Sequence, residues 1–101
     1  MDNPPFNLAD AENFAKAGAE IRAQLNRNFL ATDEPGYLDR RRRLRIAFNA
    51  IPDSFAEFLW IQLTSKDDPL AQLFHYKLHP ATVNEMLGIL WEKMKRTSPT
   101  L

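Results

Sequence analysis

The chain has no cysteine, little glycine and no long apolar run, and each absence removes a class of protein. Without cysteine there are no disulfide bonds, no thiolate chemistry and no cysteine-ligated zinc or iron–sulfur sites. The three glycines do not form a glycine-rich phosphate-binding loop. The longest apolar run, residues 58–61, is far shorter than a membrane-spanning helix, and the first residues lack the features of a secretory signal. We therefore expect a cytoplasmic protein with no membrane contact and no cofactor.

The chain also lacks a net charge, because 13 basic residues balance 13 acidic ones. A domain dedicated to nucleic acid is usually strongly basic, so this balance argues against that class. Hydrophobic residues make up 45% of the 101 residues and charged residues 26%, which is typical of a globular domain with its own core. We predict a single helical domain over residues 1–101, with frayed tails at 1–6 and 97–101.

What the sequence does contain is helical periodicity interrupted by proline. Apolar residues recur at three- and four-residue spacing, which predicts helices over residues 8–30, 37–51, 54–64 and 69–78 and a last helix that begins at residue 80 or 82. Asn7 and Asp68 are typical N-caps, and Ser54 with Glu57 has the pattern of a capping box. The connections are short. These features predict an all-α fold, a compact bundle of four to five helices.

Gly18 is an unusual residue within the first predicted helix. It lies on the same apolar stripe as Phe14, Ile21 and Leu25. Glycine in a helix interior costs about 1 kcal/mol relative to alanine. We expect another helix to approach closely at Gly18 and so offset that cost.

Positive charge is concentrated in one short segment. The second predicted helix carries Arg40, Arg41, Arg42, Arg43 and Arg45, and seven of the eight arginines fall between residues 22 and 45. Four consecutive arginines point to every side of a helix, so Arg40 or Arg41 must extend past the core, pair with an acid or enter an interface. Three interpretations stay open: a solvated helical face, a surface that binds carboxylates of a partner protein, and a contact with nucleic-acid phosphates.

The third predicted helix has more apolar residues than one buried face requires. Trp60 and Ile61 belong to a set of apolar positions that nearly surrounds this helix, and Ile46 lies behind the stripe of the second one. Either the rest of the bundle wraps the third helix on most sides, or these side chains drive association with another protein. Aromatic residues and arginine are also enriched at the centres of protein interfaces.

No catalytic or metal-binding motif stands out in this chain. His75 and His79 have the spacing of a helical metal pair, but His79 directly precedes Pro80, so we do not expect a shared helix face. A helix-turn-helix in this region has suitable lengths, but Asp67 and Asp68 at the start of its recognition helix would repel phosphates. Serine, histidine and acid occur without the spacing of a catalytic triad. We expect neither an enzyme nor a metal protein.

We therefore predict a small non-enzymatic protein–protein interaction module. It would be a regulator, inhibitor or adaptor that binds a partner protein, associates with a second copy of itself as a homodimer, or does both. We expect no small-molecule substrate. The predicted partner-binding residues are Arg40, Arg41, Arg42, Arg43, Arg45, Ile46, Trp60 and Ile61. The alternative is a nucleic-acid-binding regulator that uses the basic helix around residues 40–45.

Overall fold

A computed structural model describes residues 7–29 and 33–97, and the regular structure within these ranges is entirely helical. The five helices are α1 (Leu8–Asn26), α2 (Glu34–Ala50), α3 (Asp53–Thr64), α4 (Pro69–Lys77) and α5 (Pro80–Thr97). This arrangement confirms the predicted all-α bundle. Over the described ranges, no helix combines the length and apolarity that crossing a bilayer would need.

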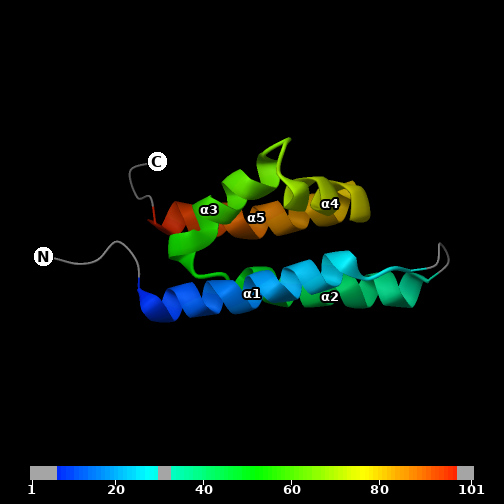
Figure 1. Ribbon diagram of the computed structural model, residues 1–101, viewed down its shortest axis with the longest axis horizontal. Helices are drawn as coiled ribbons and strands as arrows, with labels where there is room; N and C mark the ends of the chain where they lie inside the picture. The colour runs from blue at the N-terminus through cyan, green and yellow to red at the C-terminus, as the bar shows by residue number, and fades with distance from the viewer. Residues whose placement is uncertain (1–6, 30–32, 98–101) are drawn as a thin grey trace, which may run out of the picture.

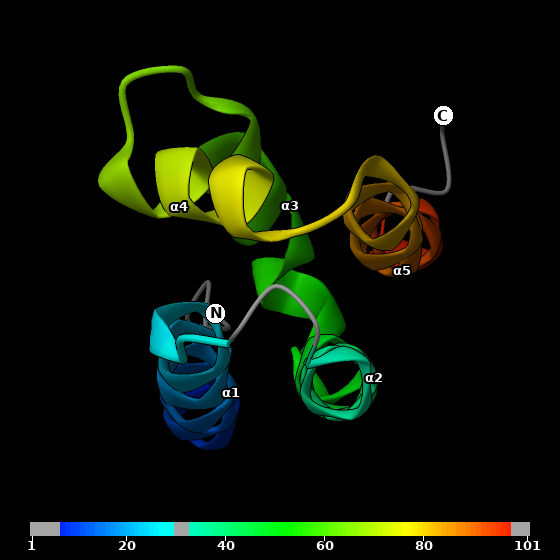
Figure 2. The ribbon, with the colours of Figure 1, turned by 90° about the vertical axis from the view of Figure 1, so that its right-hand side faces the viewer.

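The helices form two layers along the long axis of the molecule (Figures 1 and 2). α1 and α2 lie side by side and antiparallel in one layer, and α3, α4 and α5 form the other. α3 packs chiefly on α5, and α2 packs on α5 across the two layers. The core receives at least one fully buried side chain from every helix: Leu25, Phe48, Leu63, Phe74 and Met86. Burying a side chain of this size stabilises the fold by about 1.5–3 kcal/mol.

Side-chain caps begin three of the helices. Asn7 accepts a hydrogen bond from the backbone amide of Ala9 at 2.7 Å, and Asp68 caps α4 in the same way, as predicted. Asp33 caps α2 by accepting from the amide of Gly36 at 3.0 Å. Residues 34–36, which precede the predicted start of this helix at residue 37, are therefore the first turn of α2.

α1 is shorter than its apolar stripe predicts. The helix ends at Asn26, and Arg27 has extended backbone angles, whereas the prediction ran to residue 30, which lies outside the described residues. Tertiary contacts explain the early end. The guanidinium of Arg40 donates to the Arg27 carbonyl and lies 4.2 Å from the centroid of the Phe29 ring. These contacts hold residues 27–29 away from a helical path.

The predicted capping box at Ser54 is wrong. α3 begins at Asp53, with Pro52 at the N-cap, and no side chain caps it. Ser54 lies inside the first turn, and its hydroxyl donates to the Asp10 carboxylate at 3.0 Å, so it joins α3 to α1. The last helix starts at residue 80, the earlier of the two predicted positions, and Thr97 belongs to it rather than to a tail. The remaining predicted tail residues, 1–6 and 98–101, lie outside the described residues.

Candidate functional site

Arg40 is a buried structural residue. Its exposed fraction is only 3%, and burial lowers the pKa of its guanidinium. Besides the Arg27 carbonyl, it donates to the carbonyl of Lys77 at 3.4 Å, while its Nε atom has no hydrogen-bond partner among the described residues. Arg40 thus joins the end of α1 to the end of α4. The prediction that Arg40 contributes to a partner-binding surface is wrong for the chain alone, because this side chain is not accessible.

On the side of α2 that faces α1, the Asp39 carboxylate accepts hydrogen bonds from three arginines. Arg42 and Arg43 donate to its carboxylate at 2.8 and 2.9 Å, and Arg27 of the connecting segment does so at 3.2 Å. These bonds, that of Arg43 first, lower the pKa of Asp39 from 3.8 to about 2. Asp39 therefore remains a carboxylate at neutral pH and ties α2 to the segment after α1.

On the opposite side of α2, the Glu85 carboxylate likewise accepts hydrogen bonds from arginines of this helix. Arg41 donates to its carboxylate at 2.8 Å, and Arg45 donates to its second oxygen. The bond from Arg45 is the main cause that lowers the pKa of Glu85. Because Glu85 belongs to α5, the two arginines connect the two layers of the bundle.

Positive charge still exceeds negative charge around α2. Five arginines share the carboxylates of Asp39 and Glu85, which leaves an excess of three positive charges in this cluster. Arg42, Arg43, Arg45 and Ile46 are exposed and form what we call the basic surface of α2. Ile46 is 59% exposed there. Because of this excess, the surface can attract an anionic partner while the arginines keep ion pairs with Asp39 and Glu85.

The other helices do not cover α3 on most sides, so the expectation that this helix is buried all round is wrong. Its core face consists of Ala56, Leu59 and Leu63, whereas Phe58 is 62% exposed and Ile61 is 58% exposed. Residues three positions apart lie on one face of a helix, so these two side chains form a continuous apolar strip. We call Phe58 and Ile61 the apolar strip of α3.

Trp60 lies on another flank of α3, half-buried. Its ring packs against that of Trp91 on α5, with centroids 5.8 Å apart and planes inclined by 45°. Trp91 is 45% exposed, so the pair presents aromatic surface at the seam between α3 and α5. This seam and the apolar strip lie on neighbouring sides of the same helix.

The predicted binding residues thus fall into two separate groups. All the predicted arginines and Ile46 lie on α2, where Arg40 is buried and Arg41 is half-buried, and Trp60 and Ile61 lie on α3. α2 and α3 do not pack on each other, and they belong to different layers (Figures 1 and 2). One partner would therefore have to span two layers to touch both groups.

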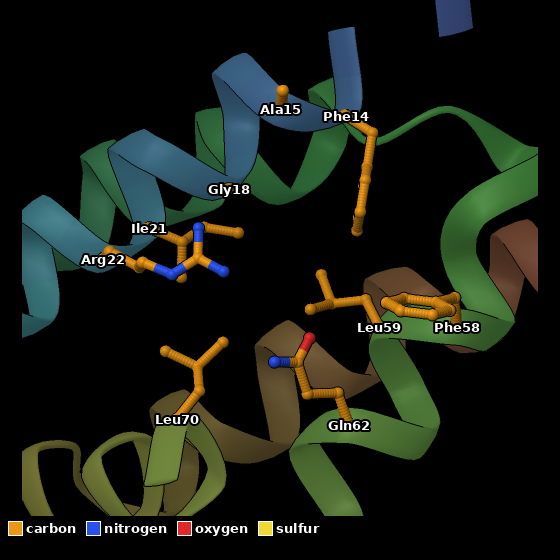
Figure 3. A pocket seen from close by; sticks show the side chains of 9 residues that line it. All are labelled: Phe14, Ala15, Gly18, Ile21, Arg22, Phe58, Leu59, Gln62 and Leu70. Atoms are coloured by element: carbon orange, nitrogen blue, oxygen red, sulfur yellow. The ribbon is translucent and has the colours of Figure 1, made fainter. Parts of the chain in front are cut away.

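A groove between α1 and α3 is a feature that the sequence did not indicate (Figure 3). It has a volume of about 400 Å³ and reaches the first turn of α4. Its apolar walls are formed by Phe14, Ile21, Phe58, Leu59 and Leu70, with Ala15 and Gly18 on the α1 side. The guanidinium of Arg22 and the amide of Gln62 point into the hollow (Figure 3).

Gly18 explains why the groove is open. A Cβ atom added at this position would meet only the Arg22 Nη1 atom, at 3.4 Å. The expectation that another helix approaches closely at Gly18 is therefore wrong, because no backbone or core side chain of another helix, among the described residues, lies within 4 Å of that Cβ position. The missing side chain leaves space along α1 instead.

The two histidines have separate neighbours. The His75 Nε2 atom lies 3.0 Å from the carbonyl oxygen of Leu63 at the end of α3, and the His79 ring contacts the Tyr37 ring edge-on at 4.8 Å. Neither contact is that of a metal ligand. Within the described ranges, no cluster of histidine and acidic residues could hold a metal ion.

Comparison of this chain with protein-family models, with curated proteins and with solved structures gives no match.

Proposed function

We propose that this chain is a small non-enzymatic protein–protein interaction module, a regulator, inhibitor or adaptor that binds a partner protein and associates with itself. The observation that carries the proposal is the apolar strip of α3, where Phe58 and Ile61 are each more than half exposed. Fully burying an exposed side chain of this size gains about 1.5–3 kcal/mol, and association would gain the part of this that corresponds to the surface these two side chains still expose. A cytoplasmic location belongs to the same proposal.

The surroundings of the strip favour a protein partner. The Trp60–Trp91 pair lies on the neighbouring flank, and tryptophan is among the residues that contribute most to interface energies. A second copy of this chain is an occupant that can be tested directly, because two apolar strips can pack on each other across a two-fold axis.

The basic surface of α2 would then add specificity. Arg42 and Arg43 each bond Asp39 through only part of their guanidinium, so further donors remain for a partner's carboxylates. The same excess of positive charge is the observation that favours the alternative, a nucleic-acid contact. That alternative predicts an affinity that falls steeply with salt, with a log–log slope of about −0.9 per phosphate contact on duplex DNA.

The test is the absolute mass by light scattering over a wide range of protein concentrations. We expect the wild-type mass to rise toward that of a dimer, and Ile61→Asp to keep the mass of a monomer with an unchanged helical circular dichroism spectrum. Tyr76→Asp is the matched control, since Tyr76 is 84% exposed on α4 and lies outside the strip. A flat monomer mass for the wild type would remove self-association, and an Ile61→Asp protein that still dimerises would remove the strip as its cause.

A gel-shift assay separates the two classes of partner. The proposal expects no retardation of duplex DNA or RNA at low salt. Retardation that disappears at high salt and with Arg42→Ala plus Arg43→Ala would instead support the nucleic-acid alternative.

A further inference from the structure

The groove between α1 and α3 has the size and lining of a small-molecule site. Its volume of about 400 Å³ falls in the range of roughly 300–1,000 Å³ that is typical of ligand pockets. Aromatic and aliphatic side chains make up most of its walls, and two polar groups reach into it. This combination of apolar walls with a few convergent polar groups is typical of ligand sites.

The polar groups of the groove lie toward one end. Figure 3 shows Arg22 and Gln62 on facing walls, with Phe14 and Phe58 farther along the hollow. Neither Arg22 nor Gln62 forms a side-chain hydrogen bond or an ion pair with the described residues. A guanidinium and an amide NH₂ that face one groove offer several donors and a positive charge, which matches a carboxylate.

Between the polar end of the groove near Arg22 and its aromatic end near Phe14 and Phe58, the groove runs past Gly18, where the lack of a side chain leaves space. Ala15 and Gly18 lie on the α1 side of the hollow, so an extended chain of methylene groups can pass along the helix there. Leu59 faces this path from α3. The lining therefore changes from cationic and polar near Arg22 to aromatic near Phe14 and Phe58.

We propose that this groove binds an aliphatic monocarboxylate of medium chain length. The carboxylate accepts hydrogen bonds from Arg22 and Gln62, and the hydrocarbon chain lies along Gly18 toward Phe14 and Phe58. The charge complementarity at Arg22 selects an anion, and the apolar walls select an aliphatic chain. The groove shares Phe58 with the apolar strip of α3, whereas Ile61 and the basic surface of α2 do not line it, so Ile61→Asp tests self-association without altering a residue of the groove.

The experiment is a titration of the ¹⁵N-labelled protein with decanoate, below the concentration at which decanoate forms micelles, followed by NMR. We expect saturable shifts of amide signals in residues 14–22 and 58–62. Decyltrimethylammonium, which has the same chain and the opposite charge, should bind more weakly by about tenfold or more, equivalent to ~1.4 kcal/mol. Equal binding of both probes, or no saturable shift with decanoate, overturns the proposal.

Variants with matched controls locate the site. Gly18→Leu fills the path of the chain and should abolish decanoate binding, whereas Gly88→Leu adds the same side chain in open space on α5 and should not. Arg22→Gln should weaken decanoate binding about tenfold, equivalent to ~1.4 kcal/mol, while Arg42→Gln leaves it unchanged. Unaltered binding by Gly18→Leu or by Arg22→Gln overturns the proposal.

If Gly18→Leu does not fold, reversal of the charge at Arg22 still tests the proposal. Arg22 is exposed, so Arg22→Glu should leave the fold intact. This variant should lose decanoate binding and gain affinity for decyltrimethylammonium. If an acidic amphipathic helical peptide shifts the same signals while decanoate does not, the groove is a peptide site and the proposal is wrong.

Discussion

The buried ammonium group of Lys93 on α5 donates a hydrogen bond to the backbone carbonyl of Asn49 at 2.8 Å. Asn49 lies in the last turn of α2, where carbonyl groups lack partners within the helix and the helix dipole favours a cation. The same ammonium lies 3.8 Å from the Asp53 carboxylate at the start of α3. One lysine therefore joins the end of α2, the start of α3 and the C-terminal part of α5.

Lys93→Met should destabilise the protein by about 1–3 kcal/mol, because it removes the part-buried hydrogen bond to the Asn49 carbonyl and the charge beside Asp53, while the side chain keeps a similar length. The free energy of unfolding in urea measures the loss. Lys95→Met is the matched control, since Lys95 is exposed and, among the described residues, pairs with Glu92 of its own helix alone. We expect that variant to change stability by less than about 0.5 kcal/mol. Equal effects of both substitutions would show that Lys93 is solvated in solution.

Arg40→Ala and Arg42→Ala separate the structural arginine from a surface one on the same helix. Arg40→Ala removes the donor of two backbone carbonyls and the packing on Phe29, so we expect a loss of about 2–4 kcal/mol. Arg42→Ala removes only an exposed ion pair with Asp39, for which we expect less than about 1 kcal/mol. Thermal and urea unfolding followed by circular dichroism compare the two. A destabilising effect of Arg42→Ala as large as that of Arg40→Ala would contradict the assignment.

Asp39→Asn should reduce stability at neutral pH, and this difference from the wild type should fade in acid. The pKa of Asp39 is lowered from 3.8 to about 2 by its three arginines, so its contribution is fully present above pH 3.8. As the pH falls from 3.8 toward 2, the unfolded chain takes up the proton first and the contribution is lost. Melting temperatures of both proteins from pH 7 to pH 2 measure this. A difference that stays constant over the whole range would show that Asp39 is not paired.

The helices could be predicted from the sequence because their signals are local. Apolar periodicity and the caps at Asn7 and Asp68 depend on residues within a few positions of each other. The errors arose where a distant residue decides the local structure. α1 ends early because Arg40 bonds the Arg27 carbonyl, and Ser54 bonds Asp10 instead of capping its own helix. No window of neighbouring residues contains these partners.

The candidate site was predictable only in part, for the same reason. The arginine run is visible in the sequence, but its division into a buried member and paired members depends on Glu85, 44 positions after Arg41. The exposure of Ile61 requires knowledge of which side of α3 the other helices cover. Phe58 was missed as a surface residue because a phenylalanine in an apolar helix is usually buried. The groove depends on the absence of a neighbour at Gly18, which no sequence pattern indicates.

The three helical glycines provide a final prediction about this open space. Gly18→Ala should stabilise the protein by about 0.5–1 kcal/mol, because alanine restricts the unfolded chain and its Cβ meets only the flexible end of Arg22. Gly88→Ala should stabilise by a similar amount, since a Cβ there has nothing within 4 Å. Gly36→Ala should destabilise, because its Cβ would clash with the Asp33 carboxylate that caps α2.

Urea unfolding of the three variants decides whether the groove is open in solution. If the hollow is open, Gly18→Ala behaves like Gly88→Ala and unlike Gly36→Ala. If a neighbouring helix closes on α1 in solution, the added methyl group strains the packing, and Gly18→Ala destabilises the protein as an overpacked core does. That outcome would mean that Gly18 serves a helix contact after all, and the hollow in Figure 3 would not persist in the native protein.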